Sequence, residues 1–419
     1  MRTSSADVVI IGAGLAGLSC ARRLMDHGIS FEIVEASDGV GGRIRTDVQD
    51  GFLLDRGFQV FLTAYPEAKR LLDYASLRLR PFVPGALVQN GSKLQRVSDP
   101  WRDPAHLLTS LVQSPGTFSD TLKIGKLRSQ VRSFSIDDIF HKSETTTLQL
   151  LKEWKFSDKM ISTFFTPFFG GVFLESDLNT SSRMFEFLFR MFAEGDATLP
   201  ADGMQAIPNQ LASKIRRERI HLNARVAEVS GTSVKLADGR KFKAKAVVVA
   251  TEGLEASRLI KDLQPPLSRG VRCLYYGAEK SPIDEPIIVL NGEGHGPVNN
   301  VCVPSEVSPT YAPSGGSLVS VTVLEGATTD TMKLETEVRN QLRRWFGADV
   351  ARWRHLRTYH LPFALPEQRP PSSNSHPKPS RIHRGMYVCG DYRETSSIQG
   401  AMVSGRRAAD SVAEDFQGQ

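Results

Sequence analysis

A glycine cluster near the start of the chain has the spacing of a phosphate-binding turn. Gly12, Gly14 and Gly17 follow the apolar run 8–11, and Glu35 ends the next apolar segment. Gly12 permits a tight turn, Gly14 lets a pyrophosphate approach the backbone, and Gly17 lets the following helix pack closely against the strands. The helix N-terminus offers N–H groups and a positive partial charge to phosphates. Glu35 can accept hydrogen bonds from both hydroxyls of an unphosphorylated ribose, so the pattern predicts a dinucleotide site.

A second glycine cluster follows this acid almost at once. Gly41 and Gly42 let the backbone pass close to the dinucleotide, and Arg43 can either make a forked contact with phosphate or brace the turn. Such a turn is typical of one large group of flavoproteins and not of nicotinamide dehydrogenases, so it indicates FAD. Ala16 and Ala36, beside these glycines and the acid, are expected to contact the same cofactor.

Four segments carry a resemblance to a known family. Residues 6–46 resemble the FAD-binding entry of the flavin amine oxidase superfamily, which includes monoamine and polyamine oxidases, protoporphyrinogen oxidases and carotenoid desaturases. Residues 199–208 are similar to its Pro, Gly-Gly-Met, Pro segment, with Asp202 in place of the first glycine. Residues 360–366 resemble the Ala-Leu-Pro segment of the protoporphyrinogen oxidase and desaturase side, and 388–405 resemble the C-terminal flavin motif. The resemblance implies an FAD-dependent oxidoreductase closer to that side than to standard amine oxidases.

The C-terminal motif predicts a helix aimed at the flavin. Gly390 and Asp391 end a strand, and apolar residues recur at helical spacing after Ser397, a competent N-cap. In the resembled family this helix points at the pyrimidine end of the flavin, where its N-terminus stabilises negative charge. The resemblance therefore implies that Ile398 and Ala401 contact the cofactor. It also implies that Asp391 accepts hydrogen bonds from hydroxyl groups of the cofactor.

The middle of the chain adds weaker candidates. Val226 resembles the family valine whose backbone meets the adenine, and Thr251 ends an apolar strand where a cofactor crevice is expected. Amine oxidases of the superfamily have a strand lysine near the flavin, but Arg272 stands at the matching position. This departure argues against a standard amine oxidase. The alternatives are a flavin amine oxidase that releases hydrogen peroxide and a flavin-binding scaffold or sensor without turnover.

Aromatic residues indicate a hydrophobic substrate. Phe168 and Phe169 lie in the Phe-rich run 164–173, whose apolar side chains could bind an isoprenoid-like or cyclic skeleton. The alternative is that these rings form the core of a helical domain. His360 and His295, each near Gly or Pro, are the candidate acid or base groups. Because flavin chemistry needs few protein groups, we list Arg272, Phe168, Phe169 and His360 as the candidate catalytic residues.

Segments typical of a dinucleotide-binding domain recur along the chain and are separated by two insertions. This order predicts an α/β fold in which a Rossmann-type FAD-binding domain is interrupted by a mixed α+β substrate domain. We assign 1–79, 200–260 and 384–419 to the FAD-binding domain. The insertions 80–199 and 261–383 form the substrate domain.

Composition narrows the class of protein. The 419 residues are 40% hydrophobic and 23% charged, as in an ordinary globular protein. No apolar run approaches the roughly 18–20 residues that span a bilayer. The first strand begins within a few residues of the N-terminus, so we expect no signal peptide and a cytoplasmic location. The basic residues in 122–143 form either a solvated helix face or a surface for peripheral membrane contact. No nucleic-acid-binding module is recognisable, and the oligomeric state stays open.

The four cysteines predict neither a metal site nor a covalent flavin link. Cys20, Cys273, Cys302 and Cys389 lack metal-ligand spacing, so reduced core thiols are expected. Cys389 precedes the Gly-Asp turn and is not placed for the family's thioether link. We therefore expect FAD to be bound non-covalently.

Overall fold

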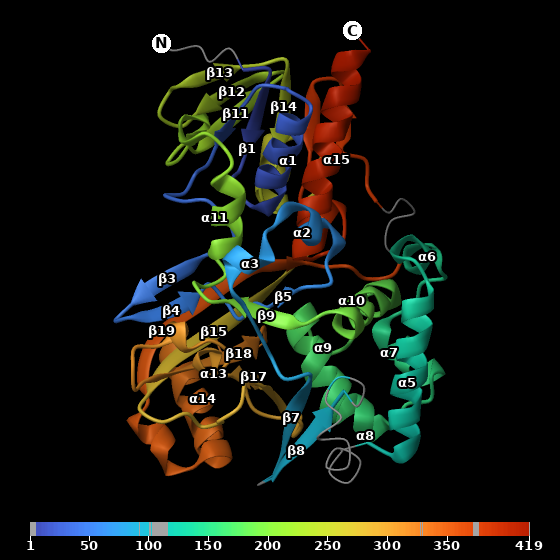
Figure 1. Cartoon of the computed structure of the whole chain (residues 1–419), viewed down its shortest axis with the longest axis vertical. Helices are drawn as coiled ribbons and strands as arrows, with labels where there is room; N and C mark the ends of the chain where they lie inside the picture. Colours follow the sequence, from blue (N-terminus) through green and yellow to red (C-terminus); the bar gives the residue numbers. More distant parts are fainter. Residues whose placement is uncertain are drawn as a thin grey trace.

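The computed structural model describes residues 6–91, 93–99, 102, 116–326, 328, 330–371 and 377–418. Figure 1 shows two parts, one above the other. One contains a sheet flanked by helices and carries both ends of the chain. The other contains a second sheet and, beside it, a layer of helices. Among the described residues, no helix is long and apolar enough to cross a membrane.

The first part contains a six-stranded sheet in the order β10-β2-β1-β14-β21-β20. All neighbouring pairs are parallel except β20 and β21. β1 and β14 are buried throughout, which explains their uninterrupted apolar sequences. This sheet, with its helices, confirms the predicted Rossmann-type α/β fold. Its strands are β1 (Val8–Ile11), β2 (Phe31–Val34), β10 (Ile220–His221), β14 (Ala246–Val249), β20 (Arg381–His383) and β21 (Met386–Val388).

Two long helices, α1 (Leu15–Asp26) and α15 (Ile398–Gln417), pack side by side against this sheet. Ser397 caps α15 by accepting a hydrogen bond from the Gly400 N–H at 3.0 Å, so the helix begins where its spacing predicts. Gly405 allows the close approach of the helices, because a Cβ at this position would lie 2.1 Å from the Ala16 carbonyl oxygen.

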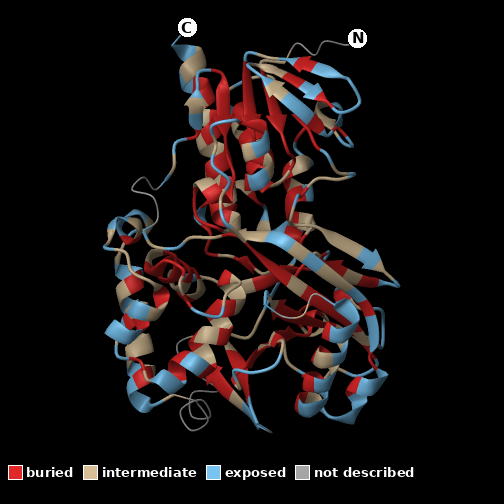
Figure 2. Cartoon of the chain, turned by 180° about the vertical axis from the view of Figure 1, so that it is seen from behind, coloured by how far each residue is buried: buried red, intermediate tan, exposed pale blue. Residues whose placement is uncertain are grey.

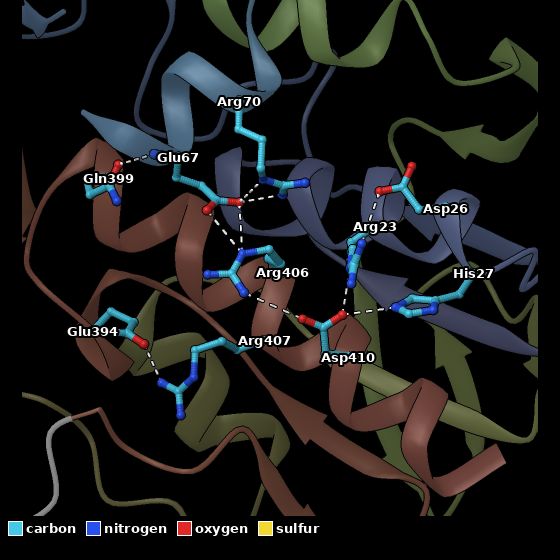
Figure 3. A network of polar contacts seen from close by, with 10 residues as sticks. All are labelled: Arg23, Asp26, His27, Glu67, Arg70, Glu394, Gln399, Arg406, Arg407 and Asp410. Carbon is cyan, nitrogen blue, oxygen red and sulfur yellow. Dashed lines mark hydrogen bonds and ion pairs between the residues drawn. The ribbon is translucent and has the colours of Figure 1, made fainter. Parts of the chain in front are cut away.

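Charged side chains tie α15 to α1 and to α2 (Pro66–Leu71), as Figure 3 shows. The buried Glu67 of α2 pairs with Arg406 at 3.1 Å, and its N–H donates to the Gln399 side chain at 2.9 Å. Asp410 accepts from Arg23 at 2.6 Å and lies 2.9 Å from the His27 ring nitrogen. These contacts hold α15 against α1 and α2 along much of its length.

Smaller elements complete the first part. A three-stranded sheet packs beside the six-stranded one and buries its apolar side chains in a shared core. The elements are β11 (Val226–Ser230), β12 (Ser233–Leu236), β13 (Lys241–Lys243), α11 (Ala206–Ala212) and α12 (Gly253–Leu259).

The second part is built on a seven-stranded mixed sheet in the order β19-β15-β18-β17-β16-β7-β8. β7 and β16 join the two insertions by pairing in parallel. α14 (Thr331–Phe346) covers one face, while the other face turns toward the cofactor part. The strands are β7 (Gly85–Asn90), β8 (Lys93–Ser98), β15 (Ser268–Ala278), β16 (Ile288–Asn291), β17 (Val298–Cys302), β18 (Ser317–Leu324) and β19 (Arg354–Pro366).

A helical layer lies beside this sheet, and Figure 2 shows many buried residues in its helices. They include Phe165, Phe169, Phe173, Phe185 and Phe187. A π-helical turn at Ile161–Phe165 precedes α9, where the Thr166 N–H bonds to the Ile161 carbonyl. Pro167 follows and cannot donate a backbone hydrogen bond, which weakens the regular α-helical pattern here. The helices are α5 (Phe118–Ser133), α6 (Ile136–His141), α7 (Thr147–Glu153), α8 (Asp158–Met160), α9 (Thr166–Phe173) and α10 (Ser182–Glu194).

Short elements connect the two parts. β5 and β6 pair on either side of β9, and β3 pairs with β4 in a hairpin that leads into the site. These elements are β3 (Thr46–Gln49), β4 (Phe52–Asp55), β5 (Phe61–Leu62), β6 (Leu79–Pro81), β9 (Ala197–Pro200), α3 (Tyr74–Leu77) and α13 (Pro304–Val307).

A buried carboxyl group at the end of β4 joins the parts. Asp55 accepts hydrogen bonds from the Thr46 hydroxyl at 2.5 Å, the Met204 N–H at 3.0 Å and the Tyr311 hydroxyl at 2.9 Å. Burial raises the pKa of Asp55 to about 6, because the low-dielectric interior disfavours the ionised form more than these donors favour it.

This raised pKa predicts a pH-dependent stability. The unfolded carboxyl ionises near pH 3.8. Asp55 therefore contributes most stability below that pH, loses it as the pH rises toward about 6, and contributes a constant penalty above. A shift of about two units corresponds to roughly 3 kcal/mol. Asp55→Asn keeps a carbonyl oxygen for Thr46 and Met204 but lacks the charge. Thermal unfolding should show the wild type losing stability relative to Asp55→Asn between pH 4 and 7; parallel profiles would contradict the assignment.

Candidate functional site

A cavity of about 570 Å³ lies at the carboxyl ends of β1, β2 and β14, between the two parts of the molecule. This is the edge at which open α/β sheets bind ligands. Of the predicted cofactor residues, all but Gly17 line it. They are Gly12, Gly14, Ala16, Glu35, Ala36, Gly41, Gly42, Arg43, Val226, Thr251, Gly390, Asp391, Ile398 and Ala401.

The glycines of the first turn divide into two roles. A Cβ at Gly12, whose φ is +105°, would lie 2.8 Å from the Ala250 carbonyl oxygen, and one at Gly17 would lie 2.0 Å from the Gly12 carbonyl oxygen. Both glycines therefore serve close packing. Gly14 has an ordinary φ of −74°, and no atom of the described residues lies within 4 Å of a Cβ built there. Its open side belongs to the cavity.

These features fit the pyrophosphate of a dinucleotide. Gly14 leaves room for a phosphate beside the backbone, and a Cβ built at Gly42, whose φ is +60°, would lie 3.4 Å from the Gly14 Cα. Among the described residues no side chain caps the N-terminus of α1, so its positive end can face an anion. The site can therefore hold an FAD pyrophosphate at this turn.

Glu35 lies directly after β2, on the wall of the cavity. Its side chain accepts hydrogen bonds from the Ala13 N–H at 2.7 Å and from the Ser37 N–H and hydroxyl at 2.9 and 2.8 Å. A carboxylate offers about four acceptor positions, so one remains for a ribose hydroxyl.

We predict that Glu35→Ala weakens FAD retention by about 10- to 100-fold, because hydrogen bonds to a charged group contribute about 1.5–3 kcal/mol each. Flavin content after extensive dialysis measures this effect. Glu32→Ala is the matched control, since Glu32 lies on β2 just before Glu35, pairs with His221 at 2.7 Å and does not line the cavity. Full flavin occupancy in Glu35→Ala would rule out the ribose role.

Arg43 braces the second turn. Its guanidinium donates to the Asp391 carboxylate at 2.6 Å and to the Ala364 carbonyl at 3.0 Å. Asp391 is only 5% exposed. Of the two roles that the sequence leaves open for Arg43, these contacts support the bracing role, since they join the segment around residue 43, β19 and the end of β21.

Much of the opposite wall comes from residues that the sequence analysis missed. The loop after β4 contributes Arg56 to Val60, α9 contributes Gly171 and Val172, and the seven-stranded sheet contributes Val271 and Thr322. One signal was available. The Asp-Arg-Gly sequence after the apolar β4 marks a turn at a strand end, and Gly57 indeed has a φ of +91°.

A second cavity of about 200 Å³ lies among the aromatic residues of the helical layer. Phe168 and Phe169 both line it, together with Phe164 and Phe165. Phe173 lies outside it, in the buried core. The aromatic run therefore contributes both to a cavity wall and to the core of the helical layer.

Arg272, His360 and His295 lie outside both cavities. Arg272 donates a hydrogen bond to the Thr328 carbonyl, and His360 is exposed. Their neighbours Val271 and Leu361 line the larger cavity instead, because successive side chains of a strand point to opposite faces. Among the described lining residues of both cavities there is neither a lysine nor a histidine.

Known proteins support the family resemblance. A family model described as flavin containing amine oxidoreductase matches residues 15–413. The chain is 33% identical to protoporphyrinogen oxidase 2 of Arabidopsis thaliana over 112 residues, 26% of this chain and 21% of that protein. It is 24% identical to L-amino-acid oxidase of Bungarus fasciatus over 306 residues, 64% of this chain and 55% of that protein.

A solved structure of a putative protoporphyrinogen oxidase from Exiguobacterium sp. 255-15 shares the fold, with a TM-score of 0.73 and 16% identity over 99% of this chain and 100% of that one. The alignments to curated relatives cover about a fifth of the first relative and about half of the second. The family model spans nearly the whole described chain and confirms the predicted flavin cofactor. The chain belongs to the family of flavin-containing amine oxidoreductases, whose members are FAD-dependent oxidoreductases.

Proposed function

We propose that this protein oxidises a hydrophobic small molecule, isoprenoid-like or cyclic, by hydride transfer to a non-covalently bound FAD. One observation carries the proposal: the cofactor cavity and an aromatic, almost wholly apolar cavity share part of their walls. Bound FAD supplies the two-electron acceptor. The chain's own residues would orient the substrate by shape and exclude water, since the shared walls carry no acid or base.

The lining residues also weigh against the alternative of amine oxidation. A cationic amine loses its hydration in an apolar cavity and needs a carboxylate partner there, whereas the walls of the smaller cavity are mainly Phe, Val and Ala. Among the described residues on those walls, the only acid is Asp99, whose carboxylate pairs with Arg128 at 2.9 Å. The relation to an L-amino-acid oxidase keeps the amine alternative open to experiment.

Anaerobic mixing of the holoprotein with candidate substrates tests the proposal. Protoporphyrinogen and a polyene, each supplied in detergent, represent the apolar class, and benzylamine and putrescine represent amines. We expect an apolar compound to bleach the flavin absorbance and the amines to leave it unchanged. Reduction by an amine, with peroxide release in air, would establish the alternative. Bound flavin that neither class reduces would support a scaffold or sensor.

Phe168 provides a test of the substrate side. Its ring lines the smaller cavity and is partly exposed to it, so Phe168→Asp should fold, keep FAD and lose at least about 100-fold in kcat/KM for an apolar substrate, because a charge would enter the apolar site. Phe173→Leu, at a buried residue of the same aromatic run that lines neither cavity, is the control and should retain most activity. Flavin loss or aggregation of Phe168→Asp would show that the aromatic cluster is purely structural.

Peripheral membrane contact also stays a proposal. On α5 one exposed stripe combines Phe118, Leu122 and Lys126, and the other side of the same helix places Ile124 on the wall of the smaller cavity. This arrangement would let an apolar substrate enter beside a lipid surface.

A further inference from the structure

The boundary between the two cavities is narrow and well defined. Phe58, Val60 and Phe192 line both of them, and each of these side chains is partly exposed. Phe58 and Val60 come from the loop after β4, which lines the cofactor cavity. Phe192 comes from the last turn of α10 in the helical layer. Three apolar side chains thus separate the cofactor cavity from the smaller cavity.

The smaller cavity presents almost only hydrocarbon to an occupant. The charged groups at its rim are Asp99, Arg102 and Arg128, and they are engaged with the protein itself. Arg128 pairs with Asp99 at 2.9 Å, and Arg102 donates to the Phe192 carbonyl at 3.0 Å and the Gly195 carbonyl at 2.8 Å. An occupant therefore meets aromatic rings and methyl groups, which bind a neutral apolar group and disfavour a charged one.

Phe192 is held in place at this boundary. Arg102 fixes its carbonyl at the end of α10, and its ring packs edge-on against Phe168 with 5.4 Å between ring centroids. Phe168 in turn stacks on Phe164 at 5.6 Å. A ring anchored on two sides is suited to define the width of the passage.

We propose that the smaller cavity is a compartment for the apolar tail of the substrate and that Phe192 sets the passage through which the tail extends. The proposal rests on the proposed function, since it assumes that the reacting end of the same molecule lies in the cofactor cavity. A volume of about 200 Å³ accommodates roughly one aromatic ring or a hydrocarbon segment of similar size, because a cavity of about 150 Å³ can bind benzene. The substrate is then a molecule with a reactive end and a flexible or flat hydrocarbon extension.

The assignment can be tested by measuring how binding affinity depends on the length of an alkyl chain, an experiment that requires no catalytic turnover. Calorimetric titration of the holoprotein with 1-alkanols, from hexanol to hexadecanol, measures the affinity of each. Each added methylene should raise the affinity about fourfold while it enters the compartment, since burial of one CH₂ contributes about 0.8 kcal/mol. The affinity should then level off once the compartment is full.

Variants inside the compartment should change the plateau length, which is the alkanol chain length at which the affinity levels off. Ala193→Leu and Ala197→Leu, at two small lining residues, each add three carbon atoms and should shorten the plateau length by about three carbons. Phe192→Ala should increase the plateau length, because the loss of the ring widens the passage and leaves more room for the alkyl chain. Phe185→Leu is the matched control: Phe185 belongs to the same helix and aromatic cluster but lines neither cavity, so the plateau should not move.

The outcomes separate this proposal from the proposed function. A plateau that both leucine variants leave unchanged, or an affinity independent of chain length, would overturn the tail compartment even if an apolar compound reduces the flavin. A plateau that moves as expected supports the compartment even if no tested compound reduces the flavin. In that case only the redox part of the proposed function fails. The two leucine variants come from different elements, so misfolding of one leaves the other to decide.

Discussion

Gly14→Ala should leave the fold intact and abolish FAD binding, whereas Gly17→Ala should destabilise the fold itself. A Cβ at Gly14 would enter open space on the cavity wall, where the backbone conformation also suits alanine. Its cost to the fold is below about 1 kcal/mol, the usual range for a changed N-cap. The methyl group would occupy the place of the pyrophosphate, so the affinity for FAD should fall by more than about 100-fold.

The corresponding Cβ at Gly17 would lie 2.0 Å from the Gly12 carbonyl oxygen and 3.3 Å from the Ala250 side chain. Neither group can move without shifting β1 or β14, so overpacking should cost about 3 kcal/mol or more. Thermal unfolding of the apoprotein and flavin content after gel filtration distinguish the two variants. Equal unfolding temperatures, or wild-type flavin content in Gly14→Ala, would contradict this division of roles.

The part of the site that the sequence predicts is the part whose contacts are local or carried by short motifs. Gly12, Gly14 and Glu35 lie within one strand-helix-strand unit, so their spacing alone places them together. The same holds for Gly390 and Ile398, which follow one strand and begin one helix. In each case a backbone requirement, a turn or a helix start, leaves a visible mark in the sequence.

The unpredicted part depends on pairing between distant segments. The parallel pairing of β7 with β16 joins residues near 88 to residues near 290, and nothing in either strand specifies its partner. The same limit applies to Arg272. Its strand is predictable, but which of two alternating residues faces the cavity depends on how β15 packs between β18 and β19. As a result Val271 lines the cavity and Arg272 does not.

The aromatic run shows a different limit. Apolar residues at 164–173 are equally suited to a core and to a cavity wall, because burial selects the same residue types for both. The structure gives both roles within one segment: Phe168 lines the smaller cavity, and Phe173 packs in the core. The π-helical turn before Pro167 alters which rings face the cavity, and periodicity at 3.6 residues does not reveal such a turn.

Arg43→Ala should be among the most destabilising single changes near the site. It removes the partner of Asp391, which is 5% exposed, and leaves a buried charge without its guanidinium. Breaking a buried pair from one side costs about 3–5 kcal/mol. Adding Asp391→Asn removes the stranded charge, so the double variant should recover a large part of the lost stability even though it contains one more substitution.

A matched surface pair provides the control for this cycle. Arg45 lies two residues away and pairs with Asp38 at 2.7 Å, but the Asp38 side chain is 74% exposed, so Arg45→Ala should change stability little. Apparent unfolding temperatures of the apoproteins compare these three variants with the wild type. Because Arg43 and Asp391 both line the cofactor cavity, the double variant should regain stability without regaining flavin. A double variant as unstable as Arg43→Ala would show that the guanidinium acts through the Ala364 carbonyl and the packing of its stem, and not through the buried charge.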